Sequence, residues 1–311
     1  MLKNSTWRFG RHIWQHYAKR GYTHAQPRTA NKTKLVGATT AGLLVSWMGW
    51  EALKSQWAND ARLSPNRYVP LELVEKEQLN YNTFRLRLAT QPQPEMFPAL
   101  SCLYIKDDAI QVMRAYTPVN PDPFKDGYVD LLIKRYDNGS VSRTLTNFAL
   151  HDHVHVRGPM IEYEYKENTK EEIGMIAGGT GITPMYQLIR RILENPNDNT
   201  RLWLIYGNKG EQDILLRKEL DMLQRNFKDR FTVHYVLEHP PAGWTGGQGF
   251  VSESTVRKFL GDKEKTLVFV CGPDKMLAHV CGQRARDFSQ GKVTGVLGSL
   301  GLTSAEVFKL E

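Results

Sequence analysis

The sequence predicts a two-domain protein in which an antiparallel β-domain precedes a parallel α/β domain. From residue 68 to about residue 165, short segments alternate apolar and polar residues and are interrupted by Pro, Gly, Asp and Asn. That pattern is typical of an antiparallel barrel or sandwich. After the polar segment 166–172, apolar segments alternate with helical periodicity, which is typical of a parallel sheet covered by helices. We therefore place the first domain at residues 68–168 and the second at residues 169–311.

The expected elements follow from the spacing of apolar residues. In the first domain, alternation with a period of two predicts six strands, at residues 68–79, 82–89, 101–107, 110–116, 128–136 and 152–159. In the second domain, continuous apolar runs predict buried strands at residues 172–178, 201–207, 231–237 and 266–272. Apolar residues at helical spacing predict helices at residues 184–195 and 212–227, and Pro184 suits the first turn of the former.

The N-terminal region carries the whole excess of positive charge. Residues 1–34 contain eight Lys or Arg and no acidic residue, which accounts for the net charge of +8 and leaves the remaining chain close to neutral. A near-neutral body argues against nucleic-acid binding. A basic segment with hydroxyl residues and without acids is typical of a mitochondrial targeting sequence, and an ordinary basic tail is the alternative.

An uncharged segment follows the basic one. Residues 35–50 contain no charged side chain, and they end in two tryptophans of the kind found at membrane interfaces. We expect a single transmembrane helix at residues 35–53, although its length also allows an interfacial or buried helix. Residues 54–67 read as a polar linker. A targeting segment followed by such an anchor predicts a mitochondrial membrane protein whose body faces the intermembrane space.

The glycine-rich stretch at residues 175–184 is a candidate ligand site. A Walker loop is excluded because Thr180 stands where the lysine is required, and Pro184 replaces the third glycine of the Rossmann pattern. Glycines between a strand and a helix let main-chain atoms approach a ligand closely. The pattern therefore favours a nucleotide site over a plain tight turn. Because ligands of parallel sheets bind beyond the carboxyl ends of the strands, residues 178–181 and 271–273 should line one crevice.

Two segments of the first domain carry possible ligand groups. In "RAYTPVN", residues 114–120, Arg114 and Tyr116 should share one face of a strand and could bind a phosphate and a flat ring. In "LLIKRYDNGSVS", residues 131–142, amides and hydroxyls after Gly139 could bind phosphate. Taken alone, the first segment is better explained as an edge strand with a surface arginine and a packed tyrosine, and the second as a hairpin loop.

Metal or disulfide chemistry is not predicted. The three cysteines form no C-x-x-C pair. His151, His153 and His155 are expected on one face of a strand and could in principle bind a metal, but a solvated strand is the favoured interpretation.

The motifs taken together resemble those of the NADH-cytochrome b5 reductases, within the ferredoxin-reductase superfamily. Six motifs occur in the same order and spacing, and the resemblance runs from about residue 68 to the C-terminus: "RAYTPVN", "LLIKRYDNGSVS", "VRGP", "MIAGGTGITPMYQLI", "YGNKGEQDILLRKEL" and "VCGPDKM". Six motifs in register are specific, whereas each alone is weak. The resemblance implies an FAD-binding β-barrel followed by an NAD-binding α/β domain.

The resemblance also implies roles for individual residues. Arg114 would contact the FAD pyrophosphate, Tyr116 would lie against the isoalloxazine, and Thr117 would bond near its reactive edge. Lys134 would stand where the nicotinamide nucleotide enters, and Cys271 would lie beside the nicotinamide, so that Thr117, Lys134 and Cys271 are the expected catalytic residues. Glu238 stands where the family commonly has aspartate and favours NADH over NADPH. The other expected cofactor-binding residues are Pro118, Ile133, Tyr136, Gly139, Ser140, Val141, Ser142, Gly178, Gly179, Thr180, Gly181, Thr183, Pro184, Gly272, Pro273 and Met276.

The implied activity is that of an FAD-dependent oxidoreductase which takes hydride from NADH and passes single electrons to a haem-type acceptor. Two alternatives stay open: a mitochondrial haem reductase that supports cytochrome c assembly, and a flavin-binding scaffold without turnover. Three departures from the family pattern bear on the acceptor: Ile161 in place of a glycine, Gly210 in place of a threonine, and a C-terminus without the usual phenylalanine.

Overall fold

The computed structural model describes residues 61–107, 111–285, 287 and 289–310. The predicted targeting segment, residues 1–34, and the predicted anchor, residues 35–53, lie outside the described residues. Among the described residues, each helix is too short or too polar to cross a bilayer.

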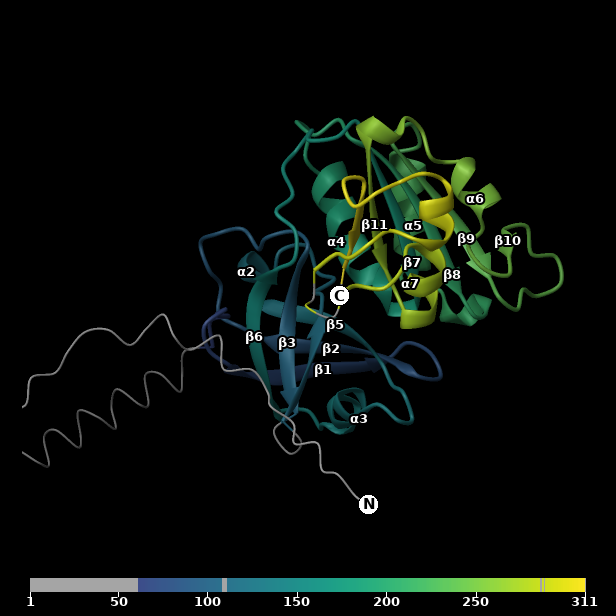
Figure 1. The fold of residues 1–311 in the computed structure, drawn as a ribbon. Coiled ribbons are helices and arrows are strands. Elements are labelled where there is room, and N and C mark those ends of the chain that lie inside the picture. Colours follow the sequence, from purple (N-terminus) through teal and green to yellow (C-terminus); the bar gives the residue numbers. More distant parts are fainter. Residues whose placement is uncertain (1–60, 108–110, 286, 288, 311) are drawn as a thin grey trace, which may run out of the picture. The chain divides into compact units, whose positions relative to one another are not determined.

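The first sheet is antiparallel and six-stranded, in the order β4-β3-β6-β1-β2-β5 (Figure 1). Strands β1 and β2 alternate buried and more exposed residues, and the buried leucines and valines of the sheet form one core on its inner face. All six expected strands are present. The strands are β1 Val69–Gln78, β2 Thr83–Ala89, β3 Ser101–Asp107, β4 Val112–Tyr116, β5 Tyr128–Lys134 and β6 His153–Ile161.

The two edges of this sheet, β4 and β5, are brought together beyond the end of β4. Val119 donates its N–H to the Asp130 carbonyl at 2.9 Å, and the Asp130 N–H donates to the Asn120 side chain at 3.0 Å. Helix α3 (Ser140–Asn147) packs against β3, β4 and β5, and a short helix α2 (Pro123–Asp126) precedes β5. The sheet therefore curls, and the turn after β4 together with α3 joins its edges.

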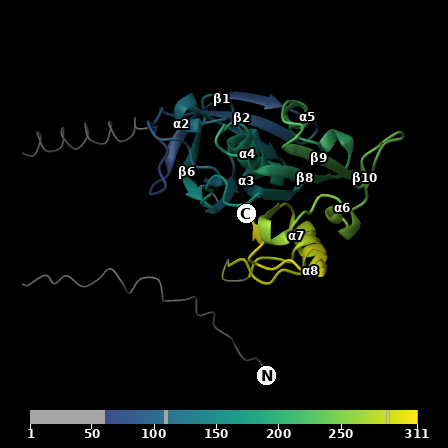
Figure 2. The same ribbon diagram turned by 90° about the horizontal axis from the view of Figure 1, so that it is seen from above.

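The second sheet, in the order β10-β9-β8-β7-β11-β12, is parallel and is covered by helices on both faces. Helices α4 and α5 pack on one face, and α6, α7 and α8 pack on the other; Figure 2 shows the yellow helices α7 and α8 on the opposite side of β8 from the green helix α5. The strands are β7 Glu172–Gly178, β8 Arg201–Asn208, β9 Phe231–Leu237, β10 Gly247–Gln248, β11 Thr266–Cys271 and β12 Val307–Lys309. The helices are α4 Ile182–Leu193, α5 Arg217–Asn226, α6 Glu253–Arg257, α7 Asp274–Val280 and α8 Gly295–Ser299, with short 3₁₀ helices η1 Gly179–Gly181, η2 Glu211–Asp213 and η3 Lys263–Lys265.

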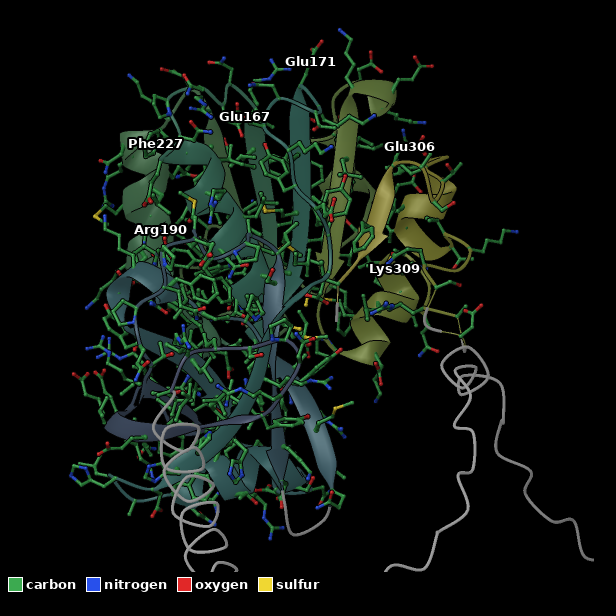
Figure 3. The ribbon with its side chains drawn as sticks, turned by 90° about the vertical axis from the view of Figure 1, so that its left-hand side faces the viewer. Glu167, Glu171, Arg190, Phe227, Glu306 and Lys309 are labelled. Atoms are coloured by element: carbon green, nitrogen blue, oxygen red, sulfur yellow. The ribbon has the colours of Figure 1, made fainter. Side chains whose placement is uncertain are left out.

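Side-chain alternation along the strands explains the two covered faces. Met175 and Leu204 belong to the core with α4 and α5, whereas their neighbours Ile176 and Ile205 belong to the core with α7 and α8. Figure 3 shows Arg190 on α4 and Lys309 on β12 at opposite sides of this domain. Such two-sided burial is why these strands read as continuous apolar runs in the sequence.

Two sequence-based expectations were wrong in detail. The helix expected at residues 212–227 starts only at Arg217, because residues 211–216 form η2 and a turn that buries Ile214 and Leu215. Leu216 ends that turn with a left-handed φ of 56°. His151 was expected on a strand with His153 and His155, but β6 begins at His153, and His151 lies in the preceding turn beside Glu72.

The two sheets share a buried boundary. Leu100 and Leu132 from the antiparallel domain pack into the core formed by β7, β8 and α4. On α4, the Gln187 side chain accepts the Ser101 N–H at 3.1 Å, and Arg191 donates to the Phe97 carbonyl at 2.5 Å. Helix α4 therefore connects the glycine-rich turn at its N-terminus to the first domain along its length.

Candidate functional site

The parallel sheet reverses its strand order between β7 and β11. The chain runs from β7 to β8 and β9 on one side, and then crosses to β11 on the other side of β7. Ligands of open α/β sheets bind at the carboxyl ends of the strands at such a switch point. The two segments that follow these ends are residues 178–181 and 271–273, which we call the switch-point edge. The structure brings them together, as the sequence predicted.

Main-chain atoms meet closely at the switch-point edge. A Cβ on Gly181 would lie 2.2 Å from the Cys271 carbonyl oxygen, and one on Gly178 would lie 2.4 Å from the Met276 sulfur. Gly179 has φ of 53°, and a Cβ there would meet nothing within 4 Å. Glycine is thus required for packing at Gly181, where the near atoms are main-chain atoms, whereas at Gly178 the near atom belongs to the flexible Met276 side chain. At Gly179 glycine exposes the main chain to open space. An approaching ligand can reach the backbone directly there.

Helix α4 starts at this edge. Its first residues follow η1, and the Thr183 hydroxyl donates to the Thr180 carbonyl at 3.1 Å, while Pro184 lies buried in the first turn. Pro184 costs nothing there because the first N–H groups of a helix have no partner within it. The partial positive charge of this twelve-residue helix points at the switch-point edge and favours an anionic group.

The carboxyl ends of β8 and β9 add polar and aromatic groups. Asn208 is only 7% exposed, and among the described residues neither polar atom of its side chain has a hydrogen-bond partner. The Glu238 N–H donates to the Asn208 carbonyl at 3.0 Å, which holds the exposed Glu238 side chain beside the end of β8. Phe250, just after β10, is 68% exposed.

Asn208 and Phe250 were missed in the sequence. Asn208 gave a weak signal as the polar residue that ends the apolar run 201–207, and Phe250 followed glycines that could have marked a turn. A buried amide without a partner and an exposed aromatic ring both suit a ligand with polar and flat parts.

Arg114 and Tyr116 lie on one face of the edge strand β4, as expected from their spacing. The Arg114 side chain is exposed and donates one N–H to the Met113 carbonyl at 2.8 Å, which leaves most of its donors for a ligand. Burial raises the pKa of Tyr116 to about 12. Thr117 and Pro118 are buried directly after the strand, and Tyr136 is half exposed.

The segment 139–142 forms the start of α3, so the hairpin-loop alternative is wrong. Gly139 is the N-cap, and a Cβ there would lie 2.5 Å from the Ser142 hydroxyl oxygen. Ser140 and Ser142 occupy the first turn, while the Val141 side chain is buried in the core. Glycine supplies no capping side chain, so the first amides of this eight-residue helix are available to an anion. Helix α3 packs against β4, the strand that carries Arg114, and helix amides together with a guanidinium are the kinds of donor that a pyrophosphate requires.

Lys134 ends β5 beside the switch-point edge, since β5 packs against η1. Its ammonium is 2.9 Å from the Asp213 carboxylate, and both side chains are largely buried. The neighbouring Ile133 is fully buried in the first core, so that any contact between Ile133 and a ligand comes from its main chain. At the other side of the edge, Cys271 is buried and Met276 is partly buried against Gly178 and Gly272.

The described residues contain no group of three His, Cys, Asp or Glu that could hold a metal ion. Their donors instead fit two flat, phosphate-bearing groups. Arginine, helix amides and a buried phenol suit a flavin dinucleotide on the antiparallel side, and a glycine turn with an exposed carboxylate suits a nicotinamide dinucleotide on the parallel side.

Comparison with known proteins agrees with this division. Residues 70–165 match the family model described as the oxidoreductase FAD-binding domain, and residues 175–282 match the oxidoreductase NAD-binding domain. The chain is 37% identical over 305 residues to NADH-cytochrome b5 reductase 2 of Coccidioides immitis, covering 92% of this chain and 93% of that protein. It is 38% identical to an NADH-cytochrome b5 reductase-like protein of Arabidopsis thaliana, covering 82% of this chain and 80% of the relative.

Among solved structures, the cytochrome b5 reductase domain of Ulva prolifera nitrate reductase superposes with a TM-score of 0.69 at 30% identity, covering 79% of this chain and 98% of that domain. The fold, the two donor sets and these similarities agree, and the protein is an FAD- and NAD-binding oxidoreductase that belongs to the NADH-cytochrome b5 reductase family.

Proposed function

We propose that this protein takes a hydride from NADH onto FAD and delivers single electrons to a haem protein. The observation that supports the proposal is the contact between β5 of the antiparallel domain and η1, the glycine-rich turn of the parallel domain. FAD supplies the conversion of a two-electron donor into one-electron steps. The protein's own task is to align the two rings and to keep water out.

Each group in the site has a positioning role in this proposal. Arg114 and the first amides of α3 hold the flavin pyrophosphate, and Tyr116 packs against its ring. Buried Thr117 and Pro118 close the first domain around the reactive edge. On the other side, Gly179 admits the nicotinamide close to the main chain, and Cys271 with Met276 forms a wall of low polarity beside it. Hydride transfer between aligned rings requires this geometry rather than an acid or a base.

The coenzyme preference is supported by the end of β9. Glu238 is exposed there, and its amide is tied to Asn208. A carboxylate at this position accepts hydrogen bonds from the ribose hydroxyls of NADH and repels the 2′-phosphate of NADPH. The exposed ring of Phe250 can stack on the adenine.

A cytochrome b5-type protein is the first candidate acceptor, because the relatives that cover most of the chain are named as cytochrome b5 reductases. The basic, acid-free residues 1–34 and the uncharged residues 35–50 favour a mitochondrial membrane protein whose body faces the intermembrane space. That location favours a second candidate, the reduction of haem during cytochrome c assembly.

The reductive half of the proposal is tested by anaerobic stopped-flow of the full-length protein in detergent. NADH should bleach the flavin absorbance rapidly, and NADPH should bleach it far more slowly at equal concentration. A preparation that carries FAD but does not bleach with NADH would refute the donor.

The oxidative half is tested by mixing the reduced protein with ferric cytochrome b5 or with ferric haem. Faster reoxidation by cytochrome b5 supports the first candidate, and faster reoxidation by haem supports the second. For location, proteases should digest the body in mitochondria with a ruptured outer membrane. Protection of the body under those conditions would contradict the proposed orientation.

A further inference from the structure

Asp213 joins three segments that are distant in sequence. Its Oδ1 accepts a hydrogen bond from the Lys134 ammonium at 2.9 Å and from the Tyr81 hydroxyl at 2.8 Å. Its Oδ2 accepts the Gly210 N–H at 3.2 Å. Lys134 and Tyr81 belong to the antiparallel domain, whereas Asp213 and Gly210 belong to the parallel domain. We call Tyr81, Lys134 and Asp213 the Asp213 cluster.

Within the Asp213 cluster, the Lys134–Asp213 pair is largely shielded from water, while Tyr81 is 58% exposed. The Asp213 side chain is 4% exposed and that of Lys134 is 13% exposed. Burial alone would raise the pKa of the Asp213 carboxyl, but hydrogen bonds from Lys134 and Tyr81 outweigh burial and hold this pKa below its usual value. The carboxylate therefore stays charged at neutral pH. A buried pair of this kind fixes side-chain positions even where its net contribution to stability is small.

The turn that carries Tyr81 is fixed by a second contact. The Asn80 side chain donates to the Gln212 carbonyl at 3.1 Å, one residue before Asp213. The β1–β2 turn thus contacts η2 through two adjacent residues. Tyr81 and Lys134 bind one oxygen of the Asp213 carboxylate and the Gly210 N–H binds the other, so the carboxylate cannot rotate without breaking these three hydrogen bonds.

Lys134 retains donors for a ligand. An ammonium has three N–H groups, and Asp213 accepts one of them. Lysine ordinarily loses much side-chain freedom when it binds an anion, because its four-carbon chain is flexible. Holding the ammonium in place beforehand removes part of that cost. Since β5 packs against η1, the held ammonium lies beside the glycine turn where an anionic ligand is expected.

We propose that Asp213 is a positioning residue, which holds Lys134 ready to bind the phosphates of NADH and is itself held by Tyr81. This inference rests on the proposed function and on the expectation from the family resemblance that Lys134 stands where the nicotinamide nucleotide enters. It adds the β1–β2 turn and η2 to the coenzyme site, although neither segment needs to touch the coenzyme. It also gives a reason why the helix expected from residue 212 begins only at Arg217: Asp213 binds Lys134 and Tyr81 of the other domain.

The test is a double-mutant cycle on the full-length protein, read out by stopped-flow flavin bleaching at varied NADH. Lys134→Met should raise the apparent Kd for NADH about tenfold, since a charge-assisted hydrogen bond is lost. Asp213→Asn should raise it by a similar factor while leaving the limiting bleaching rate within about twofold of wild type. In the Lys134→Met background, Asp213→Asn should add nothing.

Controls separate positioning from folding. Asp213→Glu should restore part of the affinity. Tyr81→Phe, on an exposed side chain that folding does not require, should raise the Kd about threefold through the weaker hold on Asp213. Asp221→Asn removes a carboxylate from an analogous pair, with Tyr235 at 2.6 Å, and should leave the Kd unchanged.

The outcomes distinguish a failure of the positioning role from a failure of the proposed coenzyme site. An unchanged Kd in Lys134→Met refutes the assignment of Lys134 to the coenzyme. A raised Kd in Lys134→Met with normal affinity in both Asp213→Asn and Tyr81→Phe overturns the positioning role alone. An Asp213→Asn effect that persists in the Lys134→Met background means that Asp213 acts on structure instead, which also overturns it.

Discussion

In the parallel sheet the switch-point edge is lined by main-chain atoms of glycines, whereas the antiparallel sheet offers side chains along β4 and β5. Gly178 and Gly181 are packed so tightly that a Cβ would overlap neighbouring atoms. Arg114, by contrast, extends into solvent and could be shortened without any steric conflict. The switch-point edge depends on the absence of side chains at its glycines, whereas the antiparallel region depends on the charge of its side chains. Substitutions should therefore disturb geometry in the first region and affinity in the second.

The largest effect is expected at Gly181. In Gly181→Ala, the new Cβ would lie 2.2 Å from the Cys271 carbonyl, so η1 and the end of β11 must separate. A displacement of about 1 Å in a site that aligns reactants can cost about 100-fold in rate. We expect NADH-driven flavin bleaching to fall by about that factor, together with a lower melting temperature, measured by stopped-flow and thermal unfolding.

The matched control is Gly207→Ala, on the adjacent strand β8, where the nearest atom to a new Cβ is the Ala177 carbonyl at 3.7 Å. That contact is ordinary, so this variant should bleach at nearly the wild-type rate. If Gly181→Ala also bleached normally, close main-chain packing would not be what defines the parallel side.

The antiparallel side should respond in affinity instead. Arg114→Ala removes a guanidinium that we assign to the FAD pyrophosphate. Hydrogen bonds to charged groups contribute about 1.5 to 3 kcal/mol, so FAD should bind roughly 10- to 100-fold more weakly. Titration of the apoprotein with FAD, followed by flavin fluorescence, measures this change. The melting temperature of the FAD-saturated protein should stay close to wild type.

Arg85→Ala is the control for charge alone, because Arg85 is exposed and pairs with Glu77 at 2.9 Å on the same domain. It should bind FAD normally. If Arg85→Ala and Arg114→Ala lost FAD affinity equally, the net charge of the domain, and not the position of Arg114, would determine how tightly FAD binds.

The two regions also differ in how far the sequence could predict them. The edge between β7 and β11 was foreseen because glycines after apolar strands are local signals, and the bounds of β3 and β9 follow directly from alternation and apolar runs. The contact between Lys134 and Asp213 was not foreseen, since 79 residues separate the two and no local pattern marks a pairing across domains. The same contact explains the misplaced start of α5.

Two other elements that the sequence did not predict, β12 and α3, have similar physical explanations. Strand β12 has three residues and pairs with β11 at the end of the chain, which is too short for a periodic signal. Helix α3 is polar and follows a glycine, features that also describe a hairpin loop. The apolar face of α3 packs against β3, β4 and β5, so it is recognised as a helix face only in the folded structure.

A smaller effect is expected at Glu238, a side chain of the parallel domain that we assign to coenzyme choice. Glu238→Ala should reduce the preference for NADH over NADPH, as a ratio of kcat/KM values, by about tenfold, because one repulsive carboxylate and its ribose contacts are lost. The measurement is steady-state ferricyanide reduction with each coenzyme. Glu264→Ala, in η3 before β11 and so at the opposite end of the strands, should leave the ratio unchanged. A wild-type ratio in Glu238→Ala would remove this side chain from the coenzyme site.

The smallest effect is expected at Tyr116, whose burial makes the stability of the protein depend on pH. The pKa of Tyr116 is raised from 10.0 to about 12, chiefly by burial. Since the folded-state pKa lies above the unfolded value, the resulting contribution to stability is fully present below pH 10 and is lost as the pH rises through about 12. From pH 8 to pH 11, wild type should therefore lose about 1 kcal/mol more unfolding free energy than Tyr116→Phe, measured by urea denaturation.

Tyr116 also sharpens the distinction between the two regions. Its phenol stays protonated up to about pH 10, so in the proposed flavin site Tyr116 is a neutral group beside the Arg114 cation. Flavin bleaching by NADH in Tyr116→Phe should then have the same pH dependence as wild type between pH 6 and about pH 10. An inflection that wild type shows in that range and Tyr116→Phe lacks, or equal losses of stability in the two proteins at pH 11, would mean that this phenol ionises in the folded protein at a lower pH than burial predicts. The antiparallel region would then contain a second charged group, the Tyr116 phenolate, although burial predicts a neutral phenol there.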